Sequence, residues 1–432
     1  MTQRSTELEG LVDGKAPPRA LRNFLLMSFC FGSAHGGMVV AIAYASSVLG
    51  TTLGSASTGT VYSVYGLTAL LGAAPFVERF GPARSICAAL GFWFLYVAMF
   101  VIAALTSAED DDGAGQWTVV LLGAAMGGFG SGIGLTAQGV YFARAAATYR
   151  KEEGISAPAA NDLFSGYFAT IFIGSQCVQY LLASMLLEFT AFDTDDLFGV
   201  FASNGFAMLM LVLVFLEEMP DPDRKREDEK TALDIWPHTL KVLQFTFTDR
   251  RAVSLAPLSV CFGFSTLFVA SYINASVTDH ISTYAVGYCG VIQTGTVALL
   301  SVPVSKISTA VGKWLAVCLG AAGYVGLTTP YLFATSAEVA HWEYVAPIFV
   351  AYGLARLSWE STTRALYADF FPNDRTTAFA SLNFVVGLSA SVYAYMLAGG
   401  VDAGTVLAAT LLAPALLIVP GYFSARDAPS EI

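Results

Sequence analysis

Long runs of apolar residues alternate with short polar connections along nearly the whole chain. A run of about 20 apolar residues is the length that an α-helix needs to cross the hydrocarbon core of a bilayer. We place twelve such spans at residues 23–46, 57–77, 85–106, 117–140, 162–187, 197–216, 253–274, 283–304, 314–335, 344–368, 377–398 and 404–423. The pattern predicts an all-α membrane protein with twelve transmembrane helices.

The hydrophobic pattern is broken once in its middle, by a Pro-rich, mixed-charge stretch that begins EEMPDPDRKREDEK. Its first part carries too much charge to pack. Its second part, with apolar residues between Ile235 and Phe245, either lies along the membrane surface or forms an irregular tether. We therefore predict an N-terminal tail at 1–22, a six-helix half at 23–216, a linker at 217–252, a second half at 253–423 and a C-terminal tail at 424–432.

The connections are sorted by the sign of their charge. One side carries the basic residues, which are Arg4, Lys15, Arg19, Arg22, Arg79, Arg84, Arg144, Arg150, Lys151, those from Arg224 to Arg251, Lys306, Lys313, Arg375 and Arg426. The other side carries acidic residues, such as those at 109–112 and 193–196, and no Lys or Arg. Basic connections stay in the cytosol during membrane insertion. Both termini and the linker are therefore predicted to be cytosolic.

Composition agrees with a membrane protein and excludes several other classes. The chain is 55% hydrophobic and 13% charged, and its mean hydropathy is +0.60. A net charge of −11 argues against nucleic acid and leaves the lipid bilayer as the predicted partner. The six cysteines fall inside predicted spans, so we predict neither a metal site nor a cofactor. No Walker-type loop, HExxH or nucleophile elbow is present, and we predict no enzyme activity.

The two halves repeat each other weakly. GLTALLGAAPFVERFGPARS at Gly66 to Ser85 has an echo in GTVALLSVPVSKISTAVGKW at Gly295 to Trp314, and both sit at the second span of their half. TAQGVYFAR at Thr136 to Arg144 likewise resembles TTRALYAD at Thr362 to Asp369. Two parallel six-helix repeats are a transporter architecture.

Three segments carry a resemblance to a known family. They are LGSASTGTVYSVYGLTALLGAAPFVERFGPARS at Leu53 to Ser85, GSGIGLTAQGVYFARAA at Gly130 to Ala146, and FFPNDRTTAFASLNFVVGLSASVYAY at Phe370 to Tyr395. They resemble the Unc-ninety-three-like branch of the major facilitator superfamily, which implies the fold of that superfamily. The chain departs from the branch at GLARLSWES around Arg356, where the family pattern has an acidic residue.

The loop after the second span matches the gating loop of the superfamily at Glu78, Arg79, Gly81 and Arg84. The resemblance implies that these residues brace the two halves on the cytosolic side. A tight glycine turn aims a carboxylate at the positive end of a facing helix, in one rocking state only. The alternative is that the charges simply anchor a loop in water.

The tenth span contains charged residues at four-residue spacing, Arg356, Glu360 and Arg364, which therefore share one helix face. Arg356 lies deep in the span, where an ionisable residue indicates function. Either Arg356 meets an anionic group in a central cavity, with Glu360 orienting it or exchanging a proton, or the two form a self-satisfied structural ion pair.

Other polar residues are candidates for the same cavity. His35 lies near the middle of the first span within GSAHGG, where it either couples transport to protons or is hydrogen-bonded in a packed bundle. Gln138, Tyr141 and Asn383 either line the cavity or bond to neighbouring helices.

Two functions of different class remain open. The first is a secondary transporter that moves a small solute or ion by rocking its two halves about a midplane site. The second is a non-transporting partner of another membrane protein, because the branch that the chain resembles includes regulators of potassium channels and a trafficking chaperone for endosomal receptors.

Overall fold

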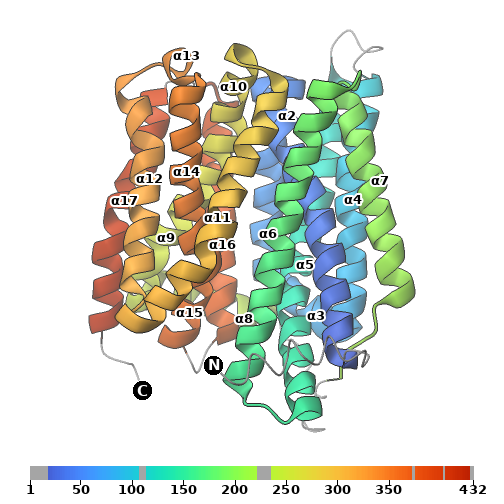
Figure 1. Cartoon of the computed structure of the whole chain (residues 1–432), viewed down its shortest axis with the longest axis vertical. Coiled ribbons are helices and arrows are strands. Elements are labelled where there is room, and N and C mark those ends of the chain that lie inside the picture. The colour runs from blue at the N-terminus through green and yellow to red at the C-terminus, as the bar shows by residue number, and fades with distance from the viewer. Residues whose placement is uncertain (1–17, 107–112, 221–234, 372–374, 402–403, 429–432) are drawn as a thin grey trace.

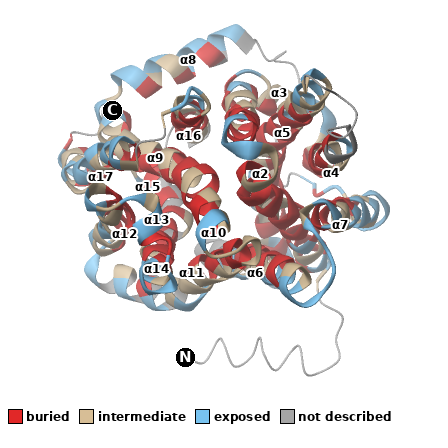
Figure 2. Cartoon of the chain, turned by 90° about the horizontal axis from the view of Figure 1, so that it is seen from above, coloured by how far each residue is buried: buried red, intermediate tan, exposed pale blue. Residues whose placement is uncertain are grey.

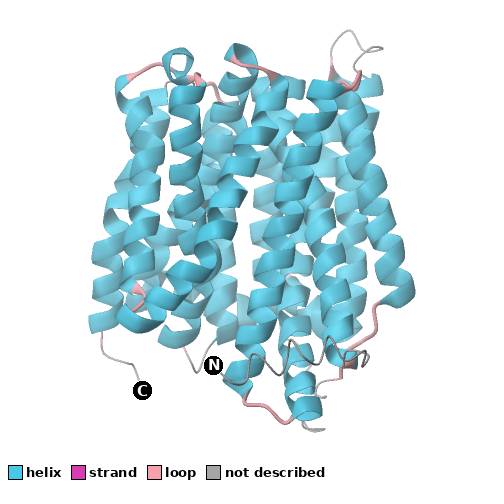
Figure 3. Ribbon diagram, viewed as in Figure 1, coloured by secondary structure: helices cyan, strands magenta, loops and turns pink. Residues whose placement is uncertain are grey.

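A computed structural model describes residues 18–106, 113–220, 235–371, 375–401 and 404–428. Helices joined by short connections make up these ranges, and no strand occurs in them (Figure 3). The predicted all-α class is therefore confirmed. The acidic connection at 109–112 and most of the charged linker, residues 221–234, lie outside the described ranges.

The first half of the chain forms a group of six helices. They are α2 (Arg19–Leu71), α3 (Ala73–Phe80), α4 (Pro82–Thr106), α5 (Ala114–Glu153), α6 (Ala157–Phe189) and α7 (Thr194–Phe215). The second half is more interrupted. It consists of α8 (Ile235–Thr248), α9 (Arg250–Leu267), η2 (Phe268–Ile273), α10 (Asn274–His280), α11 (Thr283–Val311), α12 (Trp314–Phe333), α13 (Ser336–Val339), α14 (Trp342–Ser358), η3 (Trp359–Thr363), α15 (Arg364–Phe370), α16 (Arg375–Ala398) and α17 (Gly404–Asp427).

The helix lengths suit a bilayer. Within the described residues, nine helices are long and apolar enough to cross a membrane. One of them, α2, holds the first predicted span and most of the second, whose end lies in α3. The predicted spans 283–304 and 344–368 coincide with α11 and with α14 to α15. The number of twelve crossings itself stays a prediction.

Helix α2 reverses direction at Gly50. This residue has a φ of 77° and a ψ of 157°, a conformation that glycine adopts at little cost. The two arms of α2 meet closely beside it, because a Cβ on Gly54 would lie 2.5 Å from the Cα of Ser46. The chain returns to where it started. Arg19, at the start of α2, lies beside Glu217, and Gly81, just after α3, lies beside Glu218. The first two spans therefore form a hairpin with a one-residue turn.

The helices stand side by side in two groups, α2 to α7 and α9 to α17 (Figure 1). We call the end where α2 begins and α17 ends the terminal end, and the opposite end the distal end. The groups meet where α2 packs against α16 and η2, and where α6 packs against α11. Buried residues gather between the helices while exposed ones face outward (Figure 2). Many of the exposed residues, such as Val214, Leu299 and Leu416, are apolar, as lipid contact requires.

Residues 235–248 form the helix α8 rather than an irregular tether. It lies at the edge of the bundle near α16 (Figure 2). Val242 is buried, and Thr246 donates a hydrogen bond to Ser381 of α16 over 2.7 Å. Trp236, Leu240 and Phe247 remain exposed. An apolar face left open beside membrane-spanning helices suits a helix that lies in the bilayer interface.

Candidate functional site

A buried ion pair lies near the middle of the second group of helices. The Nη2 of Arg356, in the last turn of α14, donates to Oε1 of Glu360 over 3.0 Å. The Arg356 and Glu360 side chains are only 11% and 17% exposed. The Nε of Arg356 has no hydrogen-bond partner among the described residues. Four-residue spacing brings the two charges together as predicted, but the buried Nε–H of the guanidinium has no partner among the described residues.

The backbone at this pair departs from a regular α-helix. Glu360 belongs to η3, a π-helical turn between α14 and α15. Trp359, the first residue of that turn, stacks on Phe262 of α9 with ring centroids 4.2 Å apart and an interplanar angle of 9°. Single π-turns inside α-helices occur frequently at functional sites, because the wider turn redirects the side chains. The first residue of the turn that carries Glu360 is thus packed against α9.

Tyrosines from both groups of helices lie within electrostatic range of Arg356. Tyr352 lies one turn earlier on α14 and interacts electrostatically with Arg356 and Glu360. Tyr62 of α2 and Tyr180 of α6 also interact with Arg356, although they belong to the first group. The electrostatic surroundings of Arg356 therefore include residues of both groups.

Tyr180 also lies where α6 packs closely against α11. A Cβ on Gly290 would lie 2.3 Å from Cδ1 of Tyr180, and one on Gly287 would lie 2.2 Å from Oγ of Ser184. Ser184 Oγ donates to the carbonyl of Tyr284 over 2.8 Å. Only glycine leaves room for this approach. Tyr180 therefore connects the Arg356 site to the contact between the two groups.

Further hydrogen bonds join the two groups toward the distal end. Ser47 of α2 bonds to Thr278 of α10 over 2.9 Å, and Asn274 donates to the carbonyl of Ala43 over 3.2 Å. Tyr288 of α11 donates to the carboxylate of Glu188 on α6. These hydrogen bonds connect the two groups on the distal side of Arg356.

His35 lies among aromatic rings of the first group. Its ring is 5.2 Å from that of Trp93 and 4.8 Å from that of Phe172, centroid to centroid. Its Nδ1 is 3.3 Å from Nε2 of Gln176 on α6. Gln176 precedes Tyr180 by one helical turn, so α6 connects His35 to the residues around Arg356. A proton-coupling role for His35 stays a prediction.

The other predicted cavity residues are dispersed. Gln138 is buried in α5, and Asn383 is half-buried in α16. Tyr141 is fully buried at the terminal end of α5, where its hydroxyl donates to the carbonyl of Glu217 over 2.9 Å. The structure does not bring Tyr141 to Arg356. The side chain of Arg364 lies outside the described part of the chain.

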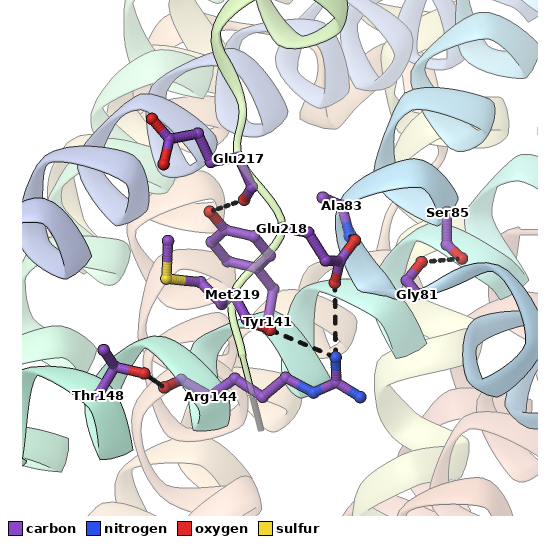
Figure 4. Close-up of polar contacts among 9 residues, drawn as sticks. All are labelled: Gly81, Ala83, Ser85, Tyr141, Arg144, Thr148, Glu217, Glu218 and Met219. Carbon is purple, nitrogen blue, oxygen red and sulfur yellow. Dashed lines mark hydrogen bonds and ion pairs between the residues drawn. The ribbon is translucent and has the colours of Figure 1, made fainter. Parts of the chain in front are cut away.

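A second cluster of charges holds the terminal end of the first group. The stretch Glu217 to Met219, just after α7, crosses the ends of α2, α4 and α5 (Figure 4). The Glu217 carboxylate pairs with Arg19 and, over 3.6 Å, with Arg22, both on α2. Arg144 of α5 reaches the carboxylate of Glu218 over 3.5 Å and the carbonyl of Met219 over 3.4 Å. We call Glu217 to Met219 the strap.

Glu218 lies at the N-terminus of α4. Its carboxylate accepts a hydrogen bond from the backbone N–H of Ala83 over 3.1 Å, where the helix dipole favours negative charge. Gly81 has a φ of 82°, and a Cβ on it would lie 2.8 Å from the Glu218 carboxylate. Burial raises the pKa of Glu218 above its usual 4.5, while the Ala83 N–H and the charge of Arg144 oppose the shift. Gly81 thus makes room for the acid that caps α4.

The predicted gating residues take different positions around this contact. Glu78 and Arg79 are exposed on α3, and the Arg79 guanidinium lies 5.9 Å from the ring centroid of Phe80. Arg84 interacts electrostatically with Glu218. The geometry predicted for Glu78, a carboxylate at a helix N-terminus beside a glycine turn, is found at Glu218 instead. Sequence reasoning missed the strap, although two adjacent acids directly after the sixth span were the available signal.

A hollow of about 480 Å³ opens at the distal end of the second group. It is lined by residues of η2, α12, α13 and α17, among them Tyr272, Phe333 and Glu338. None of the predicted site residues lines it. The hollow therefore lies apart from the Arg356 site.

Comparison with known proteins gives one family. The model of the Major Facilitator Superfamily matches residues 24–394. The protein unc-93 homolog A of Homo sapiens is 24% identical over 423 residues, 87% of this chain and 88% of that protein. The homologue from Bos taurus is 26% identical over 52% of each chain.

Solved transporter structures share the fold. A D-xylose–proton symporter superposes with a TM-score of 0.65 at 15% identity, covering 94% of this chain and 97% of the other. The inward-open xylose transporter XylE from E. coli superposes with a TM-score of 0.63, also at 15% identity, covering 94% and 95%. At this identity the likeness shows the fold alone.

Proposed function

The chain belongs to the major facilitator superfamily, and on that premise we propose that it is a secondary transporter, which moves a small solute or ion by alternating access. It is an integral, multi-pass membrane protein. The observation that carries the proposal is the shared Arg356 site. The charged pair belongs to one group of helices and interacts electrostatically with Tyr62 and Tyr180 of the other, so we expect a solute bound there to lie between the two moving parts.

We propose further that the terminal end faces the cytosol. Described basic residues such as Arg19, Arg144 and Lys313 lie at the terminal end, whereas Glu188 and Asp279 lie at the distal end. Basic residues near the ends of spans are retained in the cytosol. The distal hydrogen bonds between the groups would then lie on the outer side of the membrane. In this orientation the strap is a cytosolic brace within the first half.

Paired spin labels test the rocking motion without a known solute. Ala191 and Asp279 form a distal pair across the two groups, and Glu152 and Val311 form a terminal pair. All four residues are exposed. In a rocking transporter each pair should show two distance populations, and a shorter distal distance should accompany a longer terminal one.

The control is a label pair inside one group, Glu152 with Arg79, whose distance should keep one population. Single populations at both test pairs would contradict alternating access. They would favour the second function, a regulator or trafficking partner of another membrane protein such as a potassium channel.

A further inference from the structure

We propose that the solute is a small monocarboxylate and that each carboxylate is carried with one proton, which is held by Glu360. The inference rests on the proposed transport function and specifies its substrate class. It follows from three properties of the Arg356 site, namely its free donor, its burial and its charge balance.

The free donor points to a two-oxygen ligand. A guanidinium presents parallel N–H donors along each edge, and a carboxylate takes two of them at once. Nε and Nη2 of Arg356 make up one edge. Glu360 occupies Nη2 through Oε1 alone, and Nε has no partner among the described residues. A second carboxylate that used both donors of this edge would compete directly with Glu360.

Because the Arg356 site is buried, its net charge limits which ligands it can bind. Arg356 is 9% exposed, and Tyr180 and Tyr352, which interact with it, are 6% and 3% exposed. In such surroundings an uncompensated charge is costly. The resting pair of Arg356 and Glu360 is neutral overall. An added carboxylate would leave one excess negative charge, unless a proton neutralises one of the two carboxylates.

The exchange is balanced in charge and in atoms. The incoming carboxylate takes the Nε–H and Nη2–H donors of Arg356, and the Glu360 carboxylate leaves Nη2. Glu360 then binds one proton from the water on the side to which the site is open. No covalent bond to the solute forms or breaks. On the opposite side the solute leaves, Glu360 loses its proton and the ion pair closes again, so no net charge crosses the membrane.

We assign the proton to Glu360 because the other described groups around it are less suited to carry one. Among the described side chains, the titratable and charged groups linked electrostatically to this pair are Tyr352 of α14, Tyr62 of α2, Tyr180 of α6 and Tyr324 of α12, and Tyr324 in turn interacts with Cys261 of α9. Arginine stays charged, and tyrosine and cysteine ordinarily titrate above about pH 8. Burial favours the uncharged form of a carboxylic acid, so a carboxylate released from its partner in a buried site is the group that gains by binding a proton.

The test uses the purified, full-length protein in detergent and measures thermal unfolding. The probes are acetate, lactate and benzoate, each compared with its uncharged amide. At least one carboxylate should raise the Tm, because a ligand that binds only the folded state stabilises it. The amides should not. The apparent Kd should rise by up to about tenfold per pH unit above neutrality, because binding takes up one proton.

Two variants and a matched control assign the roles. Glu360→Gln should bind the carboxylate with an affinity that no longer depends on pH, since the amide needs no proton. Arg356→Lys keeps the charge but loses the parallel donors, so its affinity should fall by about tenfold or more. Asp369→Asn removes the acid of an exposed ion pair with Lys313 in the same half. It should keep the pH dependence of the wild type.

Three results would overturn the proposal. They are equal stabilisation by amide and carboxylate, a pH dependence that survives in Glu360→Gln, and no stabilisation by any of the three carboxylates. An affinity of the wild type that does not change with pH would show that binding takes up no proton, which contradicts the role of Glu360 as proton carrier. If one of these results is obtained and the spin-label pairs still show two distance populations, only the proposed substrate class is wrong. If the spin-label pairs show single populations, the proposed transport function is wrong as well.

Discussion

Gly287 is the position where one methyl group should change which side of the protein is open. In the structure, α11 approaches α6 so closely here that a Cβ would lie 2.5 Å from the carbonyl oxygen of Tyr180 and 3.1 Å from the amide nitrogen of Ser184. These are backbone atoms, so no side-chain rotation can relieve the contact. Gly287→Ala should therefore separate α6 from α11 and disfavour distal closure.

The size of the effect follows from the overlap. The Cβ would lie roughly 0.9 Å closer to the Tyr180 carbonyl oxygen than an ordinary van der Waals contact allows. Overpacking of this kind costs about 1–3 kcal/mol. The cost falls on the distally closed state alone, because the two helices part in the other state. Every 1.4 kcal/mol is a factor of ten. The ratio of distally open to distally closed protein should rise by about 5-fold to about 140-fold.

Reactivity of a cysteine at Ser47 reports this ratio. Ser47 lies at the boundary of the two groups and bonds to Thr278 in the closed arrangement. With the six native cysteines replaced by serine, a membrane-impermeant maleimide added from the distal side should label Ser47→Cys faster in Gly287→Ala than in its parent. The labelling rate should increase in proportion to the open population.

Gly295→Ala is the matched control on the same helix. Nothing lies within 4 Å of a Cβ at Gly295. Both substitutions add about 0.5–1 kcal/mol of helix stability relative to glycine, so only the clash distinguishes them. Equal labelling rates in the two alanine variants would refute the assignment of α6 and α11 as the distal closure.

Three other substitutions test features of the fold. Because burial holds the pKa of Glu218 above its ordinary value, its contribution to stability is present below pH 4.5 and is lost as pH rises through the raised pKa; Glu218→Gln should abolish this loss in a pH series of thermal unfolding. Tyr141→Phe removes the hydrogen bond to the Glu217 carbonyl and should lower unfolding stability by about 0.5–1.5 kcal/mol, whereas an unchanged Tm would mean that the bond adds nothing. Trp359→Ala removes the stack on Phe262 and should cost about 3–5 kcal/mol in chemical denaturation, and a loss below about 1 kcal/mol would show that the stack does not hold the π-turn.

The helices were predictable because lipid imposes a simple rule. Every backbone polar group must be paired within the membrane, so length and apolarity suffice to place a helix. The predicted spans 283–304 and 404–423 begin at the first residues of α11 and α17 or directly beside them. The pairing of Arg356 with Glu360 also followed from helical spacing, because both residues lie on one helix.

Contacts between distant segments were not predictable in the same way. Glu78 has the sequence context of a helix-capping acid, but Glu218, 140 positions away, occupies the end of α4. Tyr62 and Tyr180 gave no signal as partners of Arg356, because tyrosines are frequent in this chain and their meeting depends on how two groups of helices dock. The π-turn at Glu360 likewise depends on the Trp359 stack against another helix.

The turn at Gly50 has a consequence for biogenesis. A one-residue connection spans only a few ångströms, so neither arm of the α2 hairpin can settle in the bilayer while the other waits outside it. The ribosome-bound chain must deliver both arms as one unit, and its first stable intermediate should be the paired hairpin. An inserted loop at Gly50 would lengthen the connection, uncouple the arms and let the first one enter alone.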